Sequence, residues 1–321
     1  MTRWFLASML VAALLSGCTP SMKDLKPALS ATDAGTIWFA TPSTLVWSAD
    51  RRRLVPGEPV VLSGELALPA GPGPFPAIVV AHGCSGTGFH DGEWARTLRE
   101  WGYATFVLDS FHGRGLKEVC TSALQLVSTQ RIPDAYGALR ILATHPKIDR
   151  GRIALMGFSH GGGLTLGAST QWAKETYAAA GGPTFRAFVA FYPYCNTVYP
   201  ERERIAAPLR IHTGELDNWT PASPCARLID AMRAAGQDAT ITVYPRAHHA
   251  FDNVRLGFIN VTRADNGADC MLQTASILGP LPSLADVTAC LRKGATIAGN
   301  AKAAALARRN VRTELAELLR S

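Results

Sequence analysis

The sequence predicts an α/β fold with a mostly parallel central sheet and helices on both faces. Short apolar runs alternate with helix-compatible stretches through the middle of the chain, as in sheets whose parallel strands are joined by right-handed crossovers. The expected strands lie near residues 77–82, 103–109, 152–157, 186–192, 208–213 and 239–244. With 321 residues, 47% hydrophobic and 18% charged, the chain can bury one large core. We therefore expect a single domain over residues 35–321.

The segments on either side of this alternation are less regular. Residues 36–68 predict strands around a turn at 51–53, and residues 69–76 form a connection rich in proline and glycine. Residues 252–294 show no clear periodicity. A long helix rich in Ala, Leu and Arg is expected from about 295 to 320.

The N-terminus is typical of an export signal. Arg3 supplies a positive charge, residues 4–15 supply an apolar core too short to span a membrane, and Leu15-Ser16-Gly17-Cys18 resembles a bacterial lipoprotein box. We expect a signal peptide at 1–17, a lipid on Cys18 and a tether at 18–34. An aspartate after the lipidated cysteine is associated with retention in the inner membrane. Since Thr19 follows Cys18 here, we expect the protein at the outer membrane, facing the periplasm. The alternative is a plain secretory signal in which Cys18 is incidental.

The stretch Gly157-Phe158-Ser159-His160-Gly161-Gly162 follows an apolar strand pattern and precedes a helix-compatible segment. A strand that turns abruptly into a helix around G-x-S-x-G exposes the serine hydroxyl on a strained turn. The stretch therefore predicts a nucleophile at Ser159. The alternative is a glycine-rich turn with a purely structural role.

Two further residues complete a candidate catalytic set. Asp217 and His249 each follow an apolar strand pattern, and the order serine, aspartate, histidine is that of the α/β-hydrolases. The histidine would take the serine proton, and the aspartate would orient the histidine. His248 is the alternative base. His82 and His112 lie on loops at the same rim and are expected to be scaffold histidines.

At these motifs the chain resembles the dienelactone hydrolase family. The resemblance rests on the elbow at 157–162, on Gly214-Glu215-Leu216-Asp217 and on the segment from Tyr244 to Phe251, and it covers roughly residues 55–255. Dienelactone hydrolases proper use a cysteine nucleophile held by a glutamate, whereas this chain has Ser159 and, at the place that matches the glutamate, Gly83. This departure favours an ordinary serine hydrolase.

We also expect hydrogen-bond donors for the negative oxygen of the tetrahedral intermediate, and one residue that contacts the substrate. The backbone N–H groups of Cys84 and His160 would form the oxyanion hole. Arg114 follows a core strand, and the resemblance implies that an arginine near this place holds a substrate carboxylate. The second arginine of the family is missing, with Asn253 near its place. A structural role for Arg114 is the alternative.

Six cysteines after Cys18 suggest disulfides in an oxidising compartment. The order of the predicted strands favours two pairs, and a third pair would close a local loop after His249; free buried thiols are the alternative. The pairs are Cys84 with Cys120, Cys195 with Cys225, and Cys270 with Cys290. No cysteine or histidine spacing indicates a metal site.

The sequence therefore predicts a lipid-anchored serine hydrolase of the bacterial cell envelope that cleaves carboxylic esters through an acyl-enzyme; whether lactones are among these esters is left open. A peptidase or acyltransferase of the same fold, or a non-catalytic binding protein on a hydrolase scaffold, are the alternatives. We expect a small-molecule ester substrate and no cofactor. The formal charge is +7, but the basic residues are dispersed, so no nucleic acid partner is expected. The oligomeric state is left open.

Overall fold

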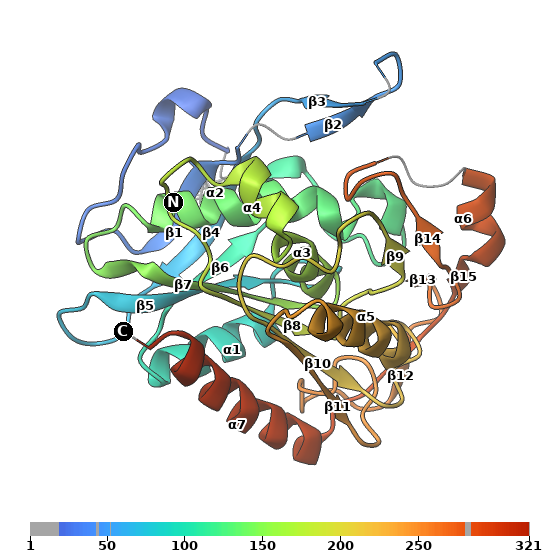
Figure 1. The fold of residues 1–321 in the computed structure, drawn as a ribbon. Coiled ribbons are helices and arrows are strands. Elements are labelled where there is room, and N and C mark those ends of the chain that lie inside the picture. The colour runs from blue at the N-terminus through green and yellow to red at the C-terminus, as the bar shows by residue number, and fades with distance from the viewer. Residues whose placement is uncertain (1–18, 43–44, 52, 280–283, 321) are drawn as a thin grey trace, which may run out of the picture.

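The computed structural model describes residues 19–42, 45–51, 53–279 and 284–320, so Cys18 and the expected signal peptide lie outside the described residues. Its central sheet has eight strands in the order β1-β4-β6-β5-β7-β8-β10-β11 (Figure 1). β1 (Gly35–Ala40) and β4 (Val61–Ala67) pair antiparallel with each other, and β4 pairs antiparallel with β6. The remaining neighbours pair parallel. The predicted mostly parallel sheet is therefore confirmed.

Each of the six strands predicted in the middle of the chain is present. They are β5 (Phe75–Ala81), β6 (Ala104–Asp109), β7 (Ile148–Phe158), β8 (Ala187–Phe191), β10 (Leu209–Gly214) and β11 (Ala239–Tyr244). β8 is buried at every position, because helices cover both faces of a parallel sheet. This double burial is why the strands appear in the sequence as continuous apolar runs.

Helices pack on both faces of the sheet (Figure 1). One face carries α2 (Ile132–Leu142), α3 (His160–Ala168), α4 (Gln171–Tyr177) and α5 (Ala222–Ala234). The other face carries α1 (Phe89–Glu100) and α7 (Ala301–Leu318). Two apolar clusters fill the layers between the helices and the sheet.

The predicted C-terminal helix is α7. It starts at Ala301, because the Asn300 side chain caps it by accepting the Ala303 N–H at 3.0 Å. Ala303, Ala307, Val311 and Leu315 recur every four residues and are buried against the sheet. No helix among the described residues is both long and apolar enough to cross a membrane.

The N-terminal region forms a hairpin of β2 (Leu45–Ser48) and β3 (Arg53–Pro56) around the predicted turn. Before β1, a 3₁₀ helix at Met22–Asp24 lies in the described part of the expected tether. Leu29 is buried in the core, and its N–H donates to Thr144 Oγ1 at 2.9 Å. Part of the expected tether therefore packs on the domain.

The described residues between β11 and α7, 252–279 and 284–297, form a segment without long strands, called the insertion below. It contains β12 (Ile259–Asn260), β13 (Asp265–Asn266), β14 (Leu272–Gln273), α6 (Leu284–Cys290), β15 (Arg292–Lys293) and β16 (Thr296–Ile297). β14 pairs with β9 (Thr197–Val198), and the other short strands pair with one another. Strands of two residues are too short to produce a periodic sequence pattern.

The connections between β6 and α2 contain three 3₁₀ helices. They span His112–Arg114, Ala123–Gln125 and Ser128–Arg131. These turns and the insertion lie on the same side of the molecule, at the carboxyl ends of the parallel strands, which is the edge where open α/β sheets bind ligands.

Candidate active site

Ser159 occupies a strained turn between β7 and α3. Its backbone has φ 53° and ψ −113°, a conformation that L-residues rarely adopt. The turn needs glycine on either side: a Cβ on Gly157 would lie 2.1 Å from the Gly161 carbonyl oxygen, and one on Gly161 would lie 2.1 Å from the Ala81 carbonyl oxygen. The sharp turn directs the serine hydroxyl toward the loops that follow β10 and β11.

Those loops bring Asp217 and His249 to the serine. His249 Nε2 lies 2.9 Å from Ser159 Oγ, and its Nδ1 lies 2.8 Å from Asp217 Oδ2. Both side chains are almost fully buried. In this network Nδ1–H donates to the carboxylate, which leaves Nε2 free to accept the serine proton. Parallel strands end at one edge of the sheet, so residues distant in sequence meet there.

His248 faces a different environment. Its Nδ1 lies 3.1 Å from Thr296 Oγ1, and its ring packs edge-on against Phe258. Of the two neighbouring histidines, the structure places His249 against the serine.

Two residues absent from the sequence analysis hold the carboxylate of Asp217. Its Oδ1 accepts the N–H groups of Trp219 and Thr220 at 2.9 and 2.8 Å. The Thr220 hydroxyl lies 3.0 Å from Oδ2 and 3.1 Å from His249 Nδ1. Aspartate side chains often bond backbone groups two and three residues ahead, so the Asp-x-x-Thr spacing was a signal for Thr220.

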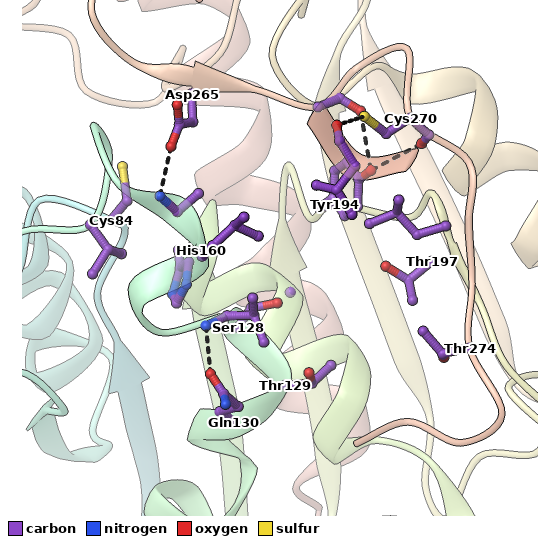
Figure 2. Close-up of a pocket in the computed structure, with 18 of the residues that line it drawn as sticks. Cys84, Ser128, Thr129, Gln130, His160, Tyr194, Thr197, Asp265, Cys270 and Thr274 are labelled. Carbon is purple, nitrogen blue, oxygen red and sulfur yellow. Dashed lines mark hydrogen bonds between the residues drawn. The ribbon is translucent and has the colours of Figure 1, made fainter. Parts of the chain in front are cut away.

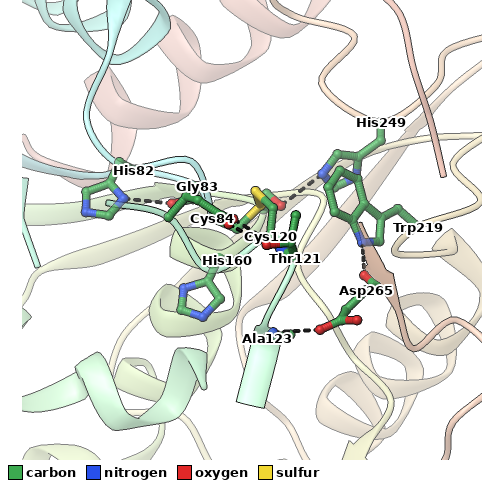
Figure 3. The surroundings of a disulfide bond; sticks show 12 residues. His82, Gly83, Cys84, Cys120, Thr121, Ala123, His160, Trp219, His249 and Asp265 are labelled. Atoms are coloured by element: carbon green, nitrogen blue, oxygen red, sulfur yellow. Dashed lines mark hydrogen bonds between the residues drawn. A yellow bond between two sulfur atoms is a disulfide. The ribbon is translucent and has the colours of Figure 1, made fainter. Parts of the chain in front are cut away.

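The backbone groups expected as oxyanion donors face the same site. Cys84 follows β5, His160 begins α3, and both line the cavity that contains Ser159. Among the described residues, neither backbone N–H has an acceptor. Figure 3 shows the disulfide between Cys84 and Cys120 next to His160 and facing His249 and Trp219. This disulfide ties the Cys84 loop to the segment after β6.

A buried arginine, Arg131, forms hydrogen bonds with both segments that carry the expected oxyanion donors. Arg131 Nη1 donates to the His82 carbonyl oxygen at 3.0 Å and to His160 Nδ1 at 2.8 Å. The other nitrogen of His160 donates to the Leu126 carbonyl at 2.8 Å. Burial, and then the charge of Arg131, lower the pKa of His160 to about 3, so its ring stays neutral. Burial also lowers the pKa of His82. Both histidines therefore have scaffold roles.

Comparison with known proteins identifies the family. The dienelactone hydrolase family model matches residues 62–274. The chain belongs to the dienelactone hydrolase family. Membership confirms the α/β-hydrolase fold and the enzyme class expected from the sequence, a carboxylic ester hydrolase of the dienelactone hydrolase type.

Relatives of this dienelactone hydrolase family member are less than 30% identical to it over the matched residues. Two curated relatives carry the name "Putative carboxymethylenebutenolidase". The one from Methylorubrum extorquens is 29% identical over 61% of this chain and 70% of its own length. The one from Yersinia pestis is 28% identical over 56% of this chain and 70% of its own length.

A solved structure shares the fold. It is a dienelactone hydrolase-like promiscuous phosphotriesterase from metagenomic libraries, with a TM-score of 0.56 and 18% identity over 90% of this chain and 100% of that one.

Arg114 does not line the active-site cavity of this family member. Its guanidinium donates to both carboxylate oxygens of Asp134, at 2.9 and 2.7 Å, and to the Ser110 carbonyl at 2.7 Å. Asp134 is fully buried in the first turn of α2, so the guanidinium supplies the countercharge that a buried carboxylate requires. The structure thus favours the structural role of Arg114 over the substrate contact expected from the sequence.

The structure contains three disulfides, and they join the pairs expected from the sequence: Cys84 with Cys120, Cys195 with Cys225, and Cys270 with Cys290. Cys84, Cys120 and Cys270 line the cavity beside Ser159. In the part of the chain that the structure describes, no cluster of His, Cys, Asp or Glu could hold a metal ion.

The cavity beside Ser159 has a volume of about 400 Å³. Figure 2 shows Cys84 and His160 on one side of it and Tyr194 and Cys270 across from them. Ligand pockets in proteins commonly measure roughly 300 to 1,000 Å³. The volume therefore suits a small-molecule substrate.

A second histidine–carboxylate pair lies close to the first. Asp252 is buried and accepts hydrogen bonds from His90 Nε2 at 2.8 Å, Trp94 Nε1 at 2.7 Å and the Tyr192 hydroxyl at 2.8 Å. The Tyr192 ring packs against the His249 ring, with centroids 4.5 Å apart. Asp252 therefore anchors the loop that carries His249 to α1 and to the end of β8.

Proposed function

We propose that this protein hydrolyses carboxylic esters through an acyl-enzyme on Ser159. The observation that carries the proposal is the continuous chain of hydrogen bonds from Ser159 Oγ through His249 to Asp217. A serine hydroxyl becomes an effective nucleophile when a neighbouring base takes its proton during attack. This geometry supports that step, and the family membership supports the reaction class.

In the first half of the reaction, Ser159 Oγ bonds to the ester carbonyl carbon while its proton passes to His249 Nε2. Asp217 stabilises the imidazolium that forms. The carbonyl oxygen becomes negative and accepts hydrogen bonds from the N–H groups of Cys84 and His160, each worth roughly 3 to 4 kcal/mol. The carbon–oxygen bond to the alcohol then breaks, and His249 returns the proton to the leaving oxygen.

In the second half, water attacks the acyl-enzyme with His249 again as the base, which releases the acid and restores Ser159. A lactone follows the same steps, except that its leaving oxygen stays attached to the acyl group. The curated relatives bear the name of an enzyme that cleaves butenolides, which are lactones. We therefore include lactones among the proposed substrates.

Replacement of the nucleophile tests this mechanism. Ser159→Ala should lower kcat for a p-nitrophenyl ester on the order of 10⁵ to 10⁶-fold while the fold survives, because covalent catalysis is lost. His249→Ala should cause a loss of similar size. His248→Ala is the matched control and should retain most of the activity. Near-normal turnover by Ser159→Ala would refute the mechanism.

We also propose that a lipid on Cys18 holds the enzyme in the bacterial cell envelope, at the periplasmic side of the outer membrane. The lipoprotein-like box at 15–18 supports this, as do three disulfides, which persist in oxidising compartments. Cys18→Ser should move the protein from the membrane fraction to the soluble fraction without changing kcat. Unchanged fractionation and unchanged mass of the mature protein would contradict the anchor.

A further inference from the structure

The cavity beside Ser159 is walled by two segments that are distant in sequence. One wall comes from residues 119–130, after β6, and the other from residues 265–279 and 287–291 of the insertion (Figure 2). Apolar side chains make up much of both walls: Leu124, Val127, Leu272, Ile277, Leu278 and Leu291. An apolar chain that enters the cavity therefore exchanges water for hydrocarbon contacts.

Neither wall carries a positive charge. Residues 119–130 and 264–291 contain no lysine or arginine. Among the described residues that line the cavity, Asp265 is the one Asp, Glu, Lys or Arg, and its carboxylate accepts the Ala123 N–H at 2.8 Å and Lys293 Nζ at 2.5 Å. Lys293 is mostly exposed and does not line the cavity. An anionic substrate would lose its hydration here without gaining a countercharge.

Several polar groups in the walls are neutral and bonded to the protein itself. The Tyr194 hydroxyl contacts the carbonyls of Gly267 and Cys270 at 3.1 and 3.0 Å, and the Thr274 hydroxyl donates to the Ser276 carbonyl at 2.8 Å. The His160 ring is neutral, as its lowered pKa shows. These groups add no charge that could attract a carboxylate.

The position of the base indicates which part of an ester enters the cavity. Ser159, Cys84 and His160 line it, whereas His249 does not. His249 has to return a proton to the leaving oxygen, so the leaving group lies on the His249 side of the serine. The acyl group then points the other way, into the cavity.

We propose that this cavity binds the acyl group and makes the enzyme selective for neutral esters with an extended apolar acyl chain. The inference rests on the proposed acyl-enzyme mechanism. Each methylene that enters the cavity raises kcat/KM by about fourfold, which corresponds to the roughly 0.8 kcal/mol of burying one CH₂ group. A carboxylate at the end of the acyl chain cancels this gain.

A series of p-nitrophenyl esters with a constant leaving group tests the proposal. From acetate to hexanoate, kcat/KM should rise at least about 50-fold, since four methylenes are added. The mono-p-nitrophenyl ester of adipic acid, which has the same chain length and a terminal carboxylate, should fall at least about 100-fold below hexanoate. The inference is overturned if acetate is the fastest substrate, or if the adipate ester lies within about tenfold of hexanoate.

A bulky substitution in the wall links the preference to this cavity. Val127→Trp should reduce kcat/KM for octanoate at least about tenfold and change acetate less than about twofold, because it shortens the space for the chain. Gln125→Trp, on the same segment but exposed and outside the lining, should leave the whole series unchanged. A full chain-length preference in Val127→Trp would overturn the assignment.

The same series separates this inference from the proposed function. If hydrolysis of acetate depends on Ser159 but chain length has no effect, the cavity assignment fails and the ester hydrolase stands. If no ester in the series shows Ser159-dependent hydrolysis, both fail.

Discussion

The loop after β11 carries one member of each of two histidine–carboxylate pairs, and the pairs have almost the same geometry. In the first, His249 Nδ1 lies 2.8 Å from Asp217 Oδ2. In the second, His90 Nε2 lies 2.8 Å from Asp252 Oδ2. Both carboxylates are fully buried, and both histidines are mostly buried. Distance and burial alone do not separate a catalytic pair from a structural one.

The partners of the two rings make the difference. The second nitrogen of His249 faces Ser159 Oγ, at the edge of a cavity. The ring of His90 packs edge-on against Phe158, with centroids 4.5 Å apart. Asp252 is already bonded by Trp94 and Tyr192 in addition to His90. A buried histidine–aspartate contact thus indicates catalysis only when the free nitrogen meets a nucleophile that a substrate can reach.

Removing the charge of Asp217 should lower kcat far more than removing the charge of Asp252. Asp217→Asn should lower kcat roughly 10⁴-fold, because the amide favours the wrong tautomer of His249. Asp252→Asn, measured where the variant is folded, should lower kcat less than about tenfold, because it acts only through the position of the loop. Steady-state kinetics on one p-nitrophenyl ester checks both. Losses of equal size would show that the pairs are not functionally distinct.

The free energy of unfolding should show the opposite order, with the larger loss in Asp252→Asn than in Asp217→Asn. Asp252→Asn should lower the free energy of unfolding by roughly 3 to 5 kcal/mol, since it breaks a buried ion pair between α1 and the His249 loop. Burial disfavours the charged form of both groups, but the attraction and the hydrogen bond between His90 and Asp252 have the larger effect. The pKa of His90 is therefore raised above 6.5, and the pKa of Asp252 is lowered below 3.8.

These shifts give the stabilisation a defined pH window. The His90 contribution is complete below pH 6.5 and is lost as pH rises through its raised pKa, whereas the Asp252 contribution is complete above pH 3.8 and is lost as pH falls through its lowered pKa. His90→Gln should therefore cost more stability at about pH 5.5 than at about pH 9. Urea unfolding at both values measures this, and a cost that grows with pH would contradict the ion pair.

The sequence predicted the sheet and the three residues of the Ser159 site because their signals are local. Apolar runs marked the strands, and the glycines beside Ser159 marked a turn that tolerates no Cβ. Asp265 was missed because its contacts are long-range: its backbone and side chain contact Cys120, Ala123, Trp219 and Lys293. The spacing from Asp217 was a local signal for Thr220, but its contact with His249 joins two loops that are 29 residues apart. For Arg114 the sequence left a substrate contact and a structural role open, because sequence alone could not show that Asp134 holds its guanidinium.

Labelling with a fluorophosphonate probe tests the central claim, attack by Ser159, most directly. The probe forms a covalent bond with an activated serine, and peptide mass spectrometry locates it. We expect one probe per folded chain, on the peptide that contains Ser159, with no labelling of Ser159→Ala and strongly slowed labelling of His249→Ala. Labelling of Ser159→Ala at the wild-type rate, or no labelling of the folded wild-type protein, would contradict it.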